Sequence, residues 1–282
     1  MKFAFVTDLH GVAGLYRQLA VFLRRERPDA LLLGGDLFPD GKRPEPHRDQ
    51  IRFISTYLQT WLSDLRSDLP EIRVVSVLGN HDWLAAAAAL ESLTRAGLLT
   101  IAHHERATLI GDVPVYGYSP VPMTPFWVKD LERLDHPDDL GRPFTGRCFV
   151  SRGEGVAEIE PAEHFLTRPS IHEELAALPL NGYPDGILIT HCPPAETFAD
   201  MMWGPRHVGS RGVREFILSR RPRVSLHGHI HEAANLCGTF ADRLGDTIVV
   251  NPGRTYETLD AVTFEWPDVA GTLRHTRFGN WL

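Results

Sequence analysis

The sequence has few cysteines. Three occur among 282 residues, at positions 148, 192 and 237, and no C-x-x-C pair is present. Neither a disulfide framework nor a thiolate zinc site is therefore expected, and a reducing cytoplasm fits this composition best. The sequence also lacks an apolar run approaching about 18 residues, and its first residues have neither the apolar core nor the cleavage site of a signal peptide. We expect a soluble cytoplasmic protein with no part in the membrane.

Positive charge is scarce as well. Lysine and arginine number 29 against 36 aspartates and glutamates, which gives a formal net charge of -7. Binding DNA or RNA over a broad surface needs many lysines and arginines facing phosphates, so a nucleic acid partner is not expected. A single phosphate ester is not excluded, because one metal ion can outweigh the global charge locally. Histidine, by contrast, is abundant with 14 residues, several of which follow predicted strands.

The first hundred residues alternate between strand-like and helix-like patterns. Apolar segments at 2–7, 30–33 and 73–78 precede helix-like stretches at 12–25, 51–65 and 83–96. Pro28 ends the first helix, and the glycines of Gly34-Gly35 and Gly79-Asn80 end the second and third strands. This β-α-β-α-β-α order predicts a largely parallel sheet with helices packed outside it.

The chain beyond residue 107 is less regular. A hairpin turn is expected at Gly111-Asp112, and prolines interrupt weak helical patterns such as 170–178 throughout residues 118–185. Strands are predicted again at 186–190, 224–226 and 247–250 and near Ala261 and Leu273, with a helix at 210–220. We expect one domain spanning 1–282, in which 118–185 is an irregular insertion or lid.

Five polar clusters each follow a predicted strand. They are Asp8-Leu9-His10, Gly35-Asp36, Gly79-Asn80-His81-Asp82, His191, and Gly228-His229-Ile230-His231. In an open α/β sheet, ligands bind outside the carboxyl ends of the strands, so these clusters are expected to converge on one crevice. Residues i and i+2 of an extended segment point to the same side, so Asp8 with His10, and His229 with His231, can each present two donor atoms.

The pooled donors are carboxylates, imidazoles and an amide oxygen, without a thiolate. This mixture suits Mn²⁺, Fe²⁺ or Zn²⁺, and suits calcium or a structural tetrahedral zinc poorly. Six or seven donors exceed the need of one tetrahedral ion, whereas two ions sharing one carboxylate would use them all. Two metal ions about 3.5 to 4 Å apart are the usual arrangement in enzymes that catalyse displacement at phosphorus. Each cluster alone is more typical of an ordinary turn, and their joint occurrence reverses that interpretation.

The ordered set D-x-H, G-D, G-N-H-D, H and G-H-x-H, from Asp8 to His231, resembles the calcineurin-like metallophosphoesterase superfamily. More loosely, His191-Cys192-Pro193-Pro194, 206–210 and 228–232 are similar to the Icc-related predicted phosphoesterases. The resemblance implies a four-layer α/β/β/α sandwich with an irregular insertion. It also implies a phosphoric ester hydrolase with two divalent metal ions, Mn²⁺ ahead of iron or zinc.

The resemblance assigns a role to each motif residue. One metal ion would be held by Asp8, His10, Asp36 and His231, and the other by Asp36, Asn80, His191 and His229. Asp36 would bridge the two ions, and a hydroxide between them would attack phosphorus in line. His81 would donate a proton to the leaving oxygen, and Asp82 would hold His81 in its working tautomer.

Residues outside the motifs are candidates for substrate contacts. His207 precedes a probable helix start at Ser210, whose free N–H groups suit an anion, and Arg43 lies in the loop that follows Asp36. Phe126, Trp127 and Lys129 could form an aromatic wall for a nucleobase or, equally, the core of the insertion. His172 has no second histidine four residues on, so it does not form an H-E-x-x-H zinc helix.

The expected activity is that of a phosphodiesterase on a small phosphoester, with a nucleotide-like compound as one option. A phosphomonoesterase is an alternative. An exonuclease of the SbcD type is another, because Gly35-Asp36-Leu37-Phe38 resembles the second motif of those enzymes. The net charge of -7 argues against the exonuclease. A non-catalytic scaffold is disfavoured, because neither a metal ligand nor the proton donor is missing. The oligomeric state and the natural substrate stay open.

Overall fold

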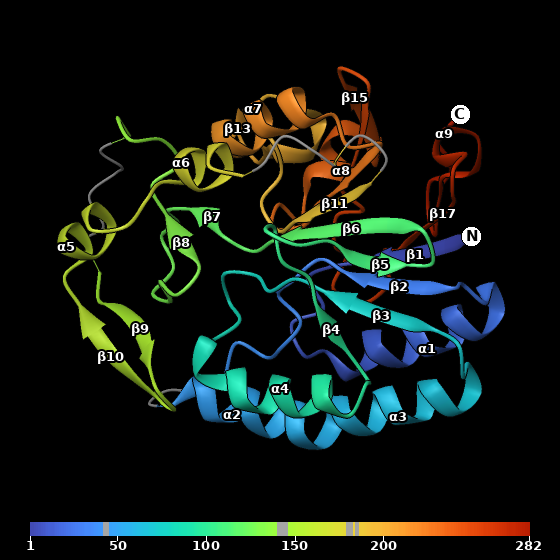
Figure 1. Ribbon diagram of the computed structural model, residues 1–282, viewed down its shortest axis with the longest axis horizontal. Coiled ribbons are helices and arrows are strands. Elements are labelled where there is room, and N and C mark those ends of the chain that lie inside the picture. Colours follow the sequence, from blue (N-terminus) through green and yellow to red (C-terminus); the bar gives the residue numbers. More distant parts are fainter. Residues whose placement is uncertain (42–44, 140–145, 179–182, 184–185) are drawn as a thin grey trace.

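The alternating apolar segments form two facing sheets in the computed structural model, which describes residues 1–41, 45–139, 146–178, 183 and 186–282 (Figure 1). The first sheet has the strand order β19-β18-β17-β1-β2-β3-β4, and the second β15-β16-β14-β11-β6-β5. In the first, β1 (Lys2–Val6), β2 (Ala30–Leu33), β3 (Arg73–Ser76) and β4 (Thr100–Ile101) are parallel, while β17 (Val262–Glu265), β18 (Arg274–His275) and β19 (Gly279–Asn280) add antiparallel strands. The predicted parallel sheet is thus confirmed.

The second sheet is built on a parallel centre. Its parallel strands are β6 (Val113–Tyr118), β11 (Ile187–Thr190), β14 (Val224–Leu226) and β16 (Thr247–Val250). Antiparallel strands close both edges, namely β5 (Thr108–Ile110), which forms the predicted hairpin with β6, and β15 (Ala241–Leu244). The carboxyl ends of the parallel strands in both sheets therefore supply the loops that position the site.

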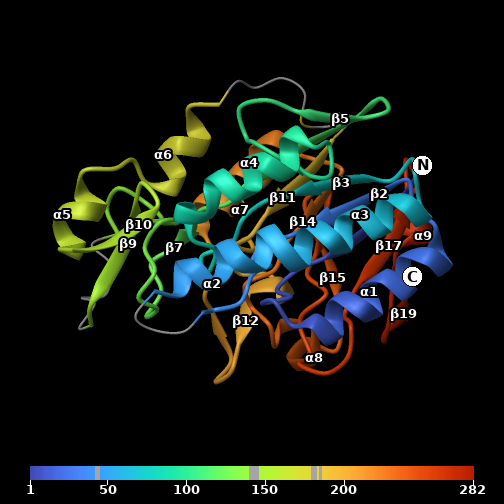
Figure 2. The same ribbon diagram turned by 90° about the horizontal axis from the view of Figure 1, so that it is seen from below.

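Helices cover the outer faces of both sheets. The first sheet is covered by α1 (Ala13–Glu26), α2 (Pro46–Phe53), α3 (Gln59–Asp68) and α4 (Ala87–Arg95), and the second by α6 (Ile171–Ala176) and α7 (Arg211–Arg220) (Figures 1 and 2). A π-helical turn at Ile54–Leu58 joins α2 to α3, and a 3₁₀ turn at Leu84–Ala86 precedes α4. The predicted helix at 51–65 is thus the middle of a longer helical run that starts at Pro46, a residue suited to the first helical turn.

Side-chain alternation along β1 separates the layers. Phe3 and Phe5 pack between the sheets against residues such as Ile189, whereas Ala4 and Val6 pack under the helices of the first layer. A third buried cluster lies between the second sheet and α6 and α7. Three stacked apolar layers need four layers of secondary structure to enclose them, which confirms the α/β/β/α sandwich.

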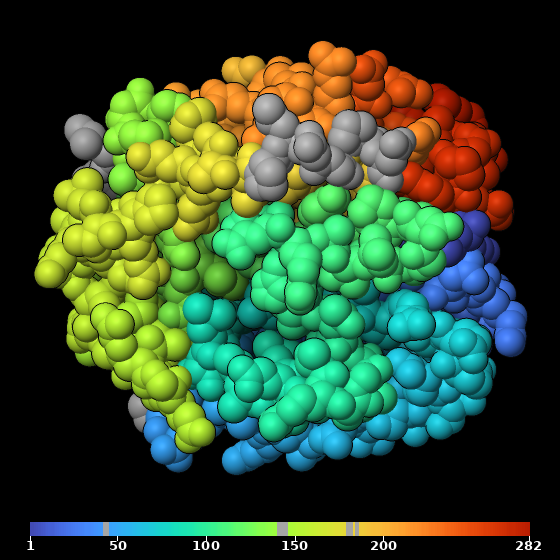
Figure 3. All heavy atoms as spheres, in the orientation of Figure 1, coloured from blue at the N-terminus to red at the C-terminus, as the bar shows by residue number. Residues whose placement is uncertain are grey.

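Small elements occupy the described part of the predicted insertion. They are β7 (Val121–Pro122) with β8 (Glu132–Arg133), β9 (Cys148–Arg152) with β10 (Gly155–Ile159), α5 (Pro161–Leu166), and α6. Trp127 of this segment packs edge-on against Trp83, and the buried Lys129 lies 2.7 Å from Glu132. In Figure 3 the segment fills the side of the molecule next to α4. Trp127 and Lys129 therefore belong to the core of the insertion, not to a substrate wall.

Most of the remaining short elements lie beside the carboxyl ends of the second sheet. They are the 3₁₀ turn Phe198–Asp200, the hairpin of β12 (Met201–Met202) and β13 (Arg206–His207), and α8 (Ala233–Cys237). The last helix, α9 (Val269–Thr272), contacts β17 of the first sheet. The hairpin projects on the side where α8 lies (Figure 2). Among the residues that the structure describes, no helix is long and apolar enough to cross a membrane.

Candidate metal centre

The five polar clusters meet at the carboxyl ends of five parallel strands. Asp8 and His10 follow β1, Asp36 follows β2, Asn80 and His81 follow β3, His191 follows β11, and His229 and His231 follow β14. These loops touch one another directly, because the Asp8 amide donates to Gly35 and the Gly228 amide donates to the carbonyl of His191. Residues as far as 223 positions apart in the chain thus line one small volume.

One group of donors surrounds Asp8. Its Oδ1 lies 3.2 Å from Nε2 of His231 and 4.0 Å from Nε2 of His10. The donor atoms of these three side chains all lie within 4.8 Å of one another. Two imidazoles and one carboxylate at this spacing are suited to a divalent first-row ion.

A second group surrounds Asp36. Its Oδ2 lies 3.3 Å from Nε2 of His191, which in turn lies 3.2 Å from the amide oxygen of Asn80. The same Oδ2 is 3.7 Å from Nε2 of His10, a member of the first group. The His229 ring packs edge-on against His191 with centroids 5.2 Å apart. Asp36 therefore lies between the two groups, within 4 Å of a histidine of each.

The backbone at these residues is strained. Asp8, His10, Asp36 and His229 have φ values of 56°, 44°, 50° and 67°, in the left-handed region that non-glycine residues rarely adopt. Such conformations cost about 1–3 kcal/mol each and persist only where the surrounding structure enforces them. The glycines serve the same packing, since a Cβ at Gly79 would collide with the Asp36 carboxylate. The loops are held in costly conformations that aim donor atoms inward.

The electrostatics of the centre also suit cations. Burial would raise the pKa of Asp8 and of Asp36, but the neighbouring histidines, His231 for Asp8 and His191 for Asp36, hold both carboxyls below their usual range. Burial lowers the pKa of His229 to about 3, so its ring is neutral at physiological pH. Nε2 of His10 is buried and has no hydrogen-bond partner. Charged carboxylates, a neutral imidazole and an unpartnered ring nitrogen fit a pair of divalent ions.

His81 lies beside this centre, where its backbone amide donates to Oδ1 of Asp36 at 2.8 Å. Its Nδ1 is 3.0 Å from Oδ1 of Asp40, and the same oxygen is 3.1 Å from Nδ1 of His10. Burial lowers the pKa of His81, but the carboxylates of Asp36 and Asp40 outweigh it and raise the value to about 9. Asp40 was not singled out from the sequence, because nothing in its local pattern distinguishes it from a turn residue.

The predicted contact between Asp82 and His81 is wrong. The buried Asp82 carboxylate accepts the backbone N–H groups of Leu37, Phe38 and Gly79 at 2.9 to 3.3 Å. These contacts direct Asp82 to the β2 loop, whereas the His81 ring lies against Asp40 and His10. Asp82 therefore fixes the loop that carries Asp36, and Asp40 takes the orienting contact predicted for Asp82.

Two more polar residues support the His229 loop. The side-chain amide of Asn251, which follows β16, donates to the carbonyls of Gly228 and Ile230 at 3.3 and 3.1 Å. His227 is buried between the hydroxyls of Thr190 and Ser225, each 2.7 Å from one ring nitrogen. His227 thus supports the strand, as its position before the motif indicates, and the role of Asn251 was missed because its partners are backbone atoms of a distant loop.

The predicted substrate contacts have different outcomes. His207 lies on β13, and its Nδ1 is 2.7 Å from Asp200. The free helix start predicted beside it is wrong, because the Asp135 carboxylate accepts the Arg211 amide at 2.7 Å and the Ser210 hydroxyl accepts the Val213 amide at 2.9 Å. Arg43 lies outside the described residues. Phe126, by contrast, packs edge-on against His81 with ring centroids 4.6 Å apart.

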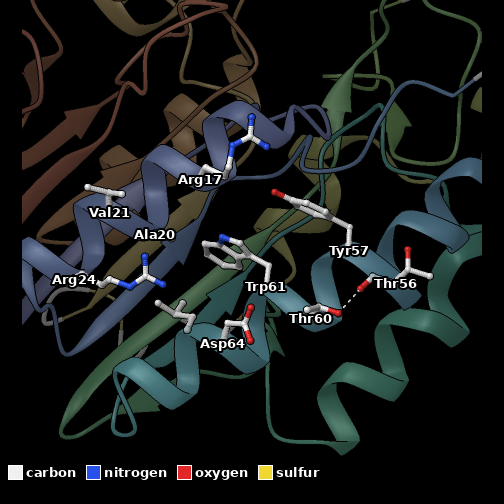
Figure 4. Close-up of a pocket in the computed structure, with 10 residues that line it drawn as sticks. Arg17, Ala20, Val21, Arg24, Thr56, Tyr57, Thr60, Trp61 and Asp64 are labelled. Carbon is white, nitrogen blue, oxygen red and sulfur yellow. Dashed lines mark hydrogen bonds between the residues drawn. The ribbon is translucent and has the colours of Figure 1, made fainter.

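A surface groove of about 680 Å³ lies elsewhere, between α1 and the helical run at 54–68 (Figure 4). Its lining consists of Arg17, Ala20, Val21, Arg24, Thr56, Tyr57, Thr60, Trp61, Asp64 and Leu65. None of these residues belongs to the donor groups, so the groove is separate from the centre.

Comparison with known proteins agrees with this geometry. The family model for the calcineurin-like phosphoesterases matches residues 1–233. No match was found among the curated proteins. Among solved structures, TT1561 of Thermus thermophilus has 18% identity and a TM-score of 0.55, with 98% of each chain covered. A dimetal phosphatase from Danio rerio has 15% identity and a TM-score of 0.50, with 93% of this chain and 92% of that chain covered.

These findings define a metal-dependent phosphoester hydrolase of mixed α/β fold. The chain belongs to the calcineurin-like phosphoesterase family, since the family model covers most of its length and all five clusters. Members of this family typically bind two divalent metal ions, and the two donor groups around Asp8 and Asp36 are candidates for holding them.

Proposed function

We propose that this protein is a phosphodiesterase for a small phosphoester and works with two divalent metal ions, Mn²⁺ foremost. The proposal rests on one observation, the position of Asp36 between the Asp8–His10–His231 group and the His191–Asn80 pair. His229 completes the second group through its contact with His191. When bound, the ions would supply a nucleophilic hydroxide and neutralise charge on the phosphate oxygens.

His81 is the residue that handles the leaving group. Its ring borders the centre without belonging to the donor group around Asp8 or the one around Asp36, and Asp40 holds its Nδ1. The other ring nitrogen, Nε2, is thereby the one that presents a proton to the departing ester oxygen. Its raised pKa keeps His81 protonated at neutral pH, as a general acid requires.

Phe126 favours a leaving group with an apolar or aromatic part. It is 44% exposed, although it packs edge-on against the ring of His81, so part of its ring is open beside the leaving-group position. A planar group such as a nucleoside base or an aryl ring would cover that part. A diester can carry such a group on either side of phosphorus, whereas the smallest monoesters carry none.

The natural test is a substrate panel with Mn²⁺. Monoesters, cyclic nucleotides, dinucleotides and pyrophosphates are compared by kcat/KM, each with the wild type and with His81→Ala. We expect aromatic diesters to lead, and His81→Ala to lose about 10²- to 10⁴-fold on esters with poor leaving groups. A clear preference for monoesters, or degradation of single-stranded DNA at low enzyme concentration, would overturn the assignment in favour of a monoesterase or an exonuclease.

A further inference from the structure

A histidine-rich cluster lies where the insertion packs against α7. His136 belongs to the loop after β8, His172 to the first turn of α6, and Glu215 to α7. One donor atom from each lies within 4.8 Å of the others. Nδ1 of His172 is 2.7 Å from Oε2 of Glu215, and the two imidazole rings are 4.4 Å apart between centroids. We refer to these three side chains as the joint cluster.

The backbone that carries the joint cluster is fixed by hydrogen bonds. The amides of Ile171 and His172 donate to the carbonyls of Leu134 and Asp135 at 2.9 and 3.0 Å. The buried Asp135 carboxylate also accepts the Arg211 amide at the start of α7. The loop and both helices are therefore held together before any ligand is present, so a ligand would not have to order them.

A fourth side chain orients His136. Its Nδ1 lies 2.7 Å from Oδ1 of Asp138, two residues on. A carboxylate that holds one ring nitrogen directs the other outward as a lone-pair donor, which is the usual support for a histidine that binds a metal ion. With Nδ1 held by Asp138, Nε2 is the ring nitrogen of His136 that is left to bind an ion.

The chemistry of the cluster selects its ligand. Two imidazoles and a carboxylate without a thiolate suit a first-row ion such as Zn²⁺, which binds nitrogen and oxygen at about 2.0–2.2 Å. Donors around such a tetrahedral ion are about 3.4 Å apart. The side chains of His136, His172 and Glu215 are 28%, 36% and 52% exposed, so they have room to rotate that short way inward.

We propose that His136, His172 and Glu215 bind one Zn²⁺-like divalent transition ion, separate from the ions of the candidate metal centre. A water molecule would complete the coordination of three protein ligands. The ion would tie the insertion, through the loop after β8 and through α6, to α7. Ser210, at the start of α7, exchanges backbone hydrogen bonds with Pro193 and Ala195. The helix that carries Glu215 of the joint cluster is therefore also attached to the loop that follows His191. The ion lies outside the candidate metal centre, because none of the three residues belongs to its donor groups.

Zinc stoichiometry tests the site. Metal-depleted full-length protein is equilibrated with Zn²⁺, and bound zinc per chain is counted by elemental mass spectrometry. We expect His172→Gln and Glu215→Gln each to bind one ion fewer than the wild type. The matched control His103→Gln, which changes another exposed histidine, should bind as many as the wild type. Equal zinc content in all four proteins would overturn the proposal.

A second background separates this site from the candidate metal centre. In the double variant Asp8→Asn/Asp36→Asn, in which both donor groups of the candidate metal centre are impaired, one ion should remain, and Zn²⁺ should raise the melting temperature. Adding His172→Gln to that background should abolish both the ion and the shift, while adding His103→Gln should abolish neither. Loss of all zinc in the double variant would refute the joint cluster as a zinc site, whereas a wild type that binds only the ion of the joint cluster would refute the candidate metal centre and leave the joint cluster standing.

Discussion

Asp40 and Asp82 offer the sharpest test of how the centre is organised. The side chain of Asp40 is 64% exposed, yet its Oδ1 contacts a ring nitrogen of both His10 and His81. Asp82 is fully buried and accepts three backbone N–H groups. The two carboxylates thus have opposite expected effects, because one orients reactive side chains and the other holds the loop.

Replacing Asp40 by alanine should reduce turnover with little loss of stability. Loss of a carboxylate that orients a metal-binding or catalytic histidine typically costs about 10- to 100-fold in activity or metal affinity. An exposed substitution changes the free energy of unfolding by about 0.5 kcal/mol or less. Asp40→Asn keeps an acceptor oxygen for the imidazoles, so its loss of activity should be the smaller of the two.

The assay compares two diesters with different leaving groups. p-Nitrophenolate departs without much help from an acid, whereas an alkoxide needs a proton. Asp40→Ala should therefore lower kcat more on an alkyl diester than on bis-p-nitrophenyl phosphate, with KM changing less than kcat on either. Equal losses on both esters would show that Asp40 acts only through His10 and its metal ion.

Asp82→Ala is the contrasting variant. It leaves three buried N–H groups without their acceptor, which should lower the free energy of unfolding by about 2–4 kcal/mol in urea titrations. The opposite pattern would refute the assignment of the orienting contact to Asp40. In that pattern Asp82→Ala is stable and loses more kcat on the alkyl diester than on bis-p-nitrophenyl phosphate, whereas Asp40→Ala shows no such difference between the two esters.

Three further predictions concern the metal ligands, the substrate and acid stability. His229→Ala should bind one ion fewer than the wild type at the candidate metal centre and lose most turnover, as measured by metal content and kcat; unchanged metal content would contradict its place there. Phe126→Ala should raise KM about three- to tenfold for aromatic diesters and leave the KM of methyl phosphate unchanged, whereas equal effects on both would contradict a leaving-group contact. Burial lowers the pKa of His275 from 6.5 to about 4, so the unfolded chain binds more protons than the folded chain between these values. Stability should therefore fall by up to about 3 kcal/mol as the pH drops through this window, and His275→Asn should remove that part of the slope in urea unfolding.

Much of the architecture could be predicted from local patterns. The apolar segments at 2–7, 30–33 and 73–78 match β1, β2 and β3 closely, because short apolar runs, two of them ended by glycine, are typical of buried strands. The convergence of Asp8, Asp36 and His191 followed from one rule about the carboxyl ends of parallel strands. Neither inference required knowledge of a contact between side chains.

Inferences that required such contacts failed. The partner of His81 depends on the path of the loop after Asp36, which places Asp40 beside the ring and turns Asp82 away. The start of α7 was expected to be free, but its amides are accepted by Asp135, which is 76 residues from Arg211 in the chain. Hydrogen bonds over such separations leave no periodic signal in the sequence.

The central claim is that two divalent ions held around Asp36 carry out phosphodiester hydrolysis. Titration of metal-depleted protein with Mn²⁺, with bound ions and turnover of bis-p-nitrophenyl phosphate measured on the same samples, tests it most directly. We predict no turnover without metal, a rise that saturates when two ions are bound at the centre, and loss of both in Asp36→Asn. Full activity in the metal-depleted protein, or no turnover with any first-row metal ion, would contradict the claim.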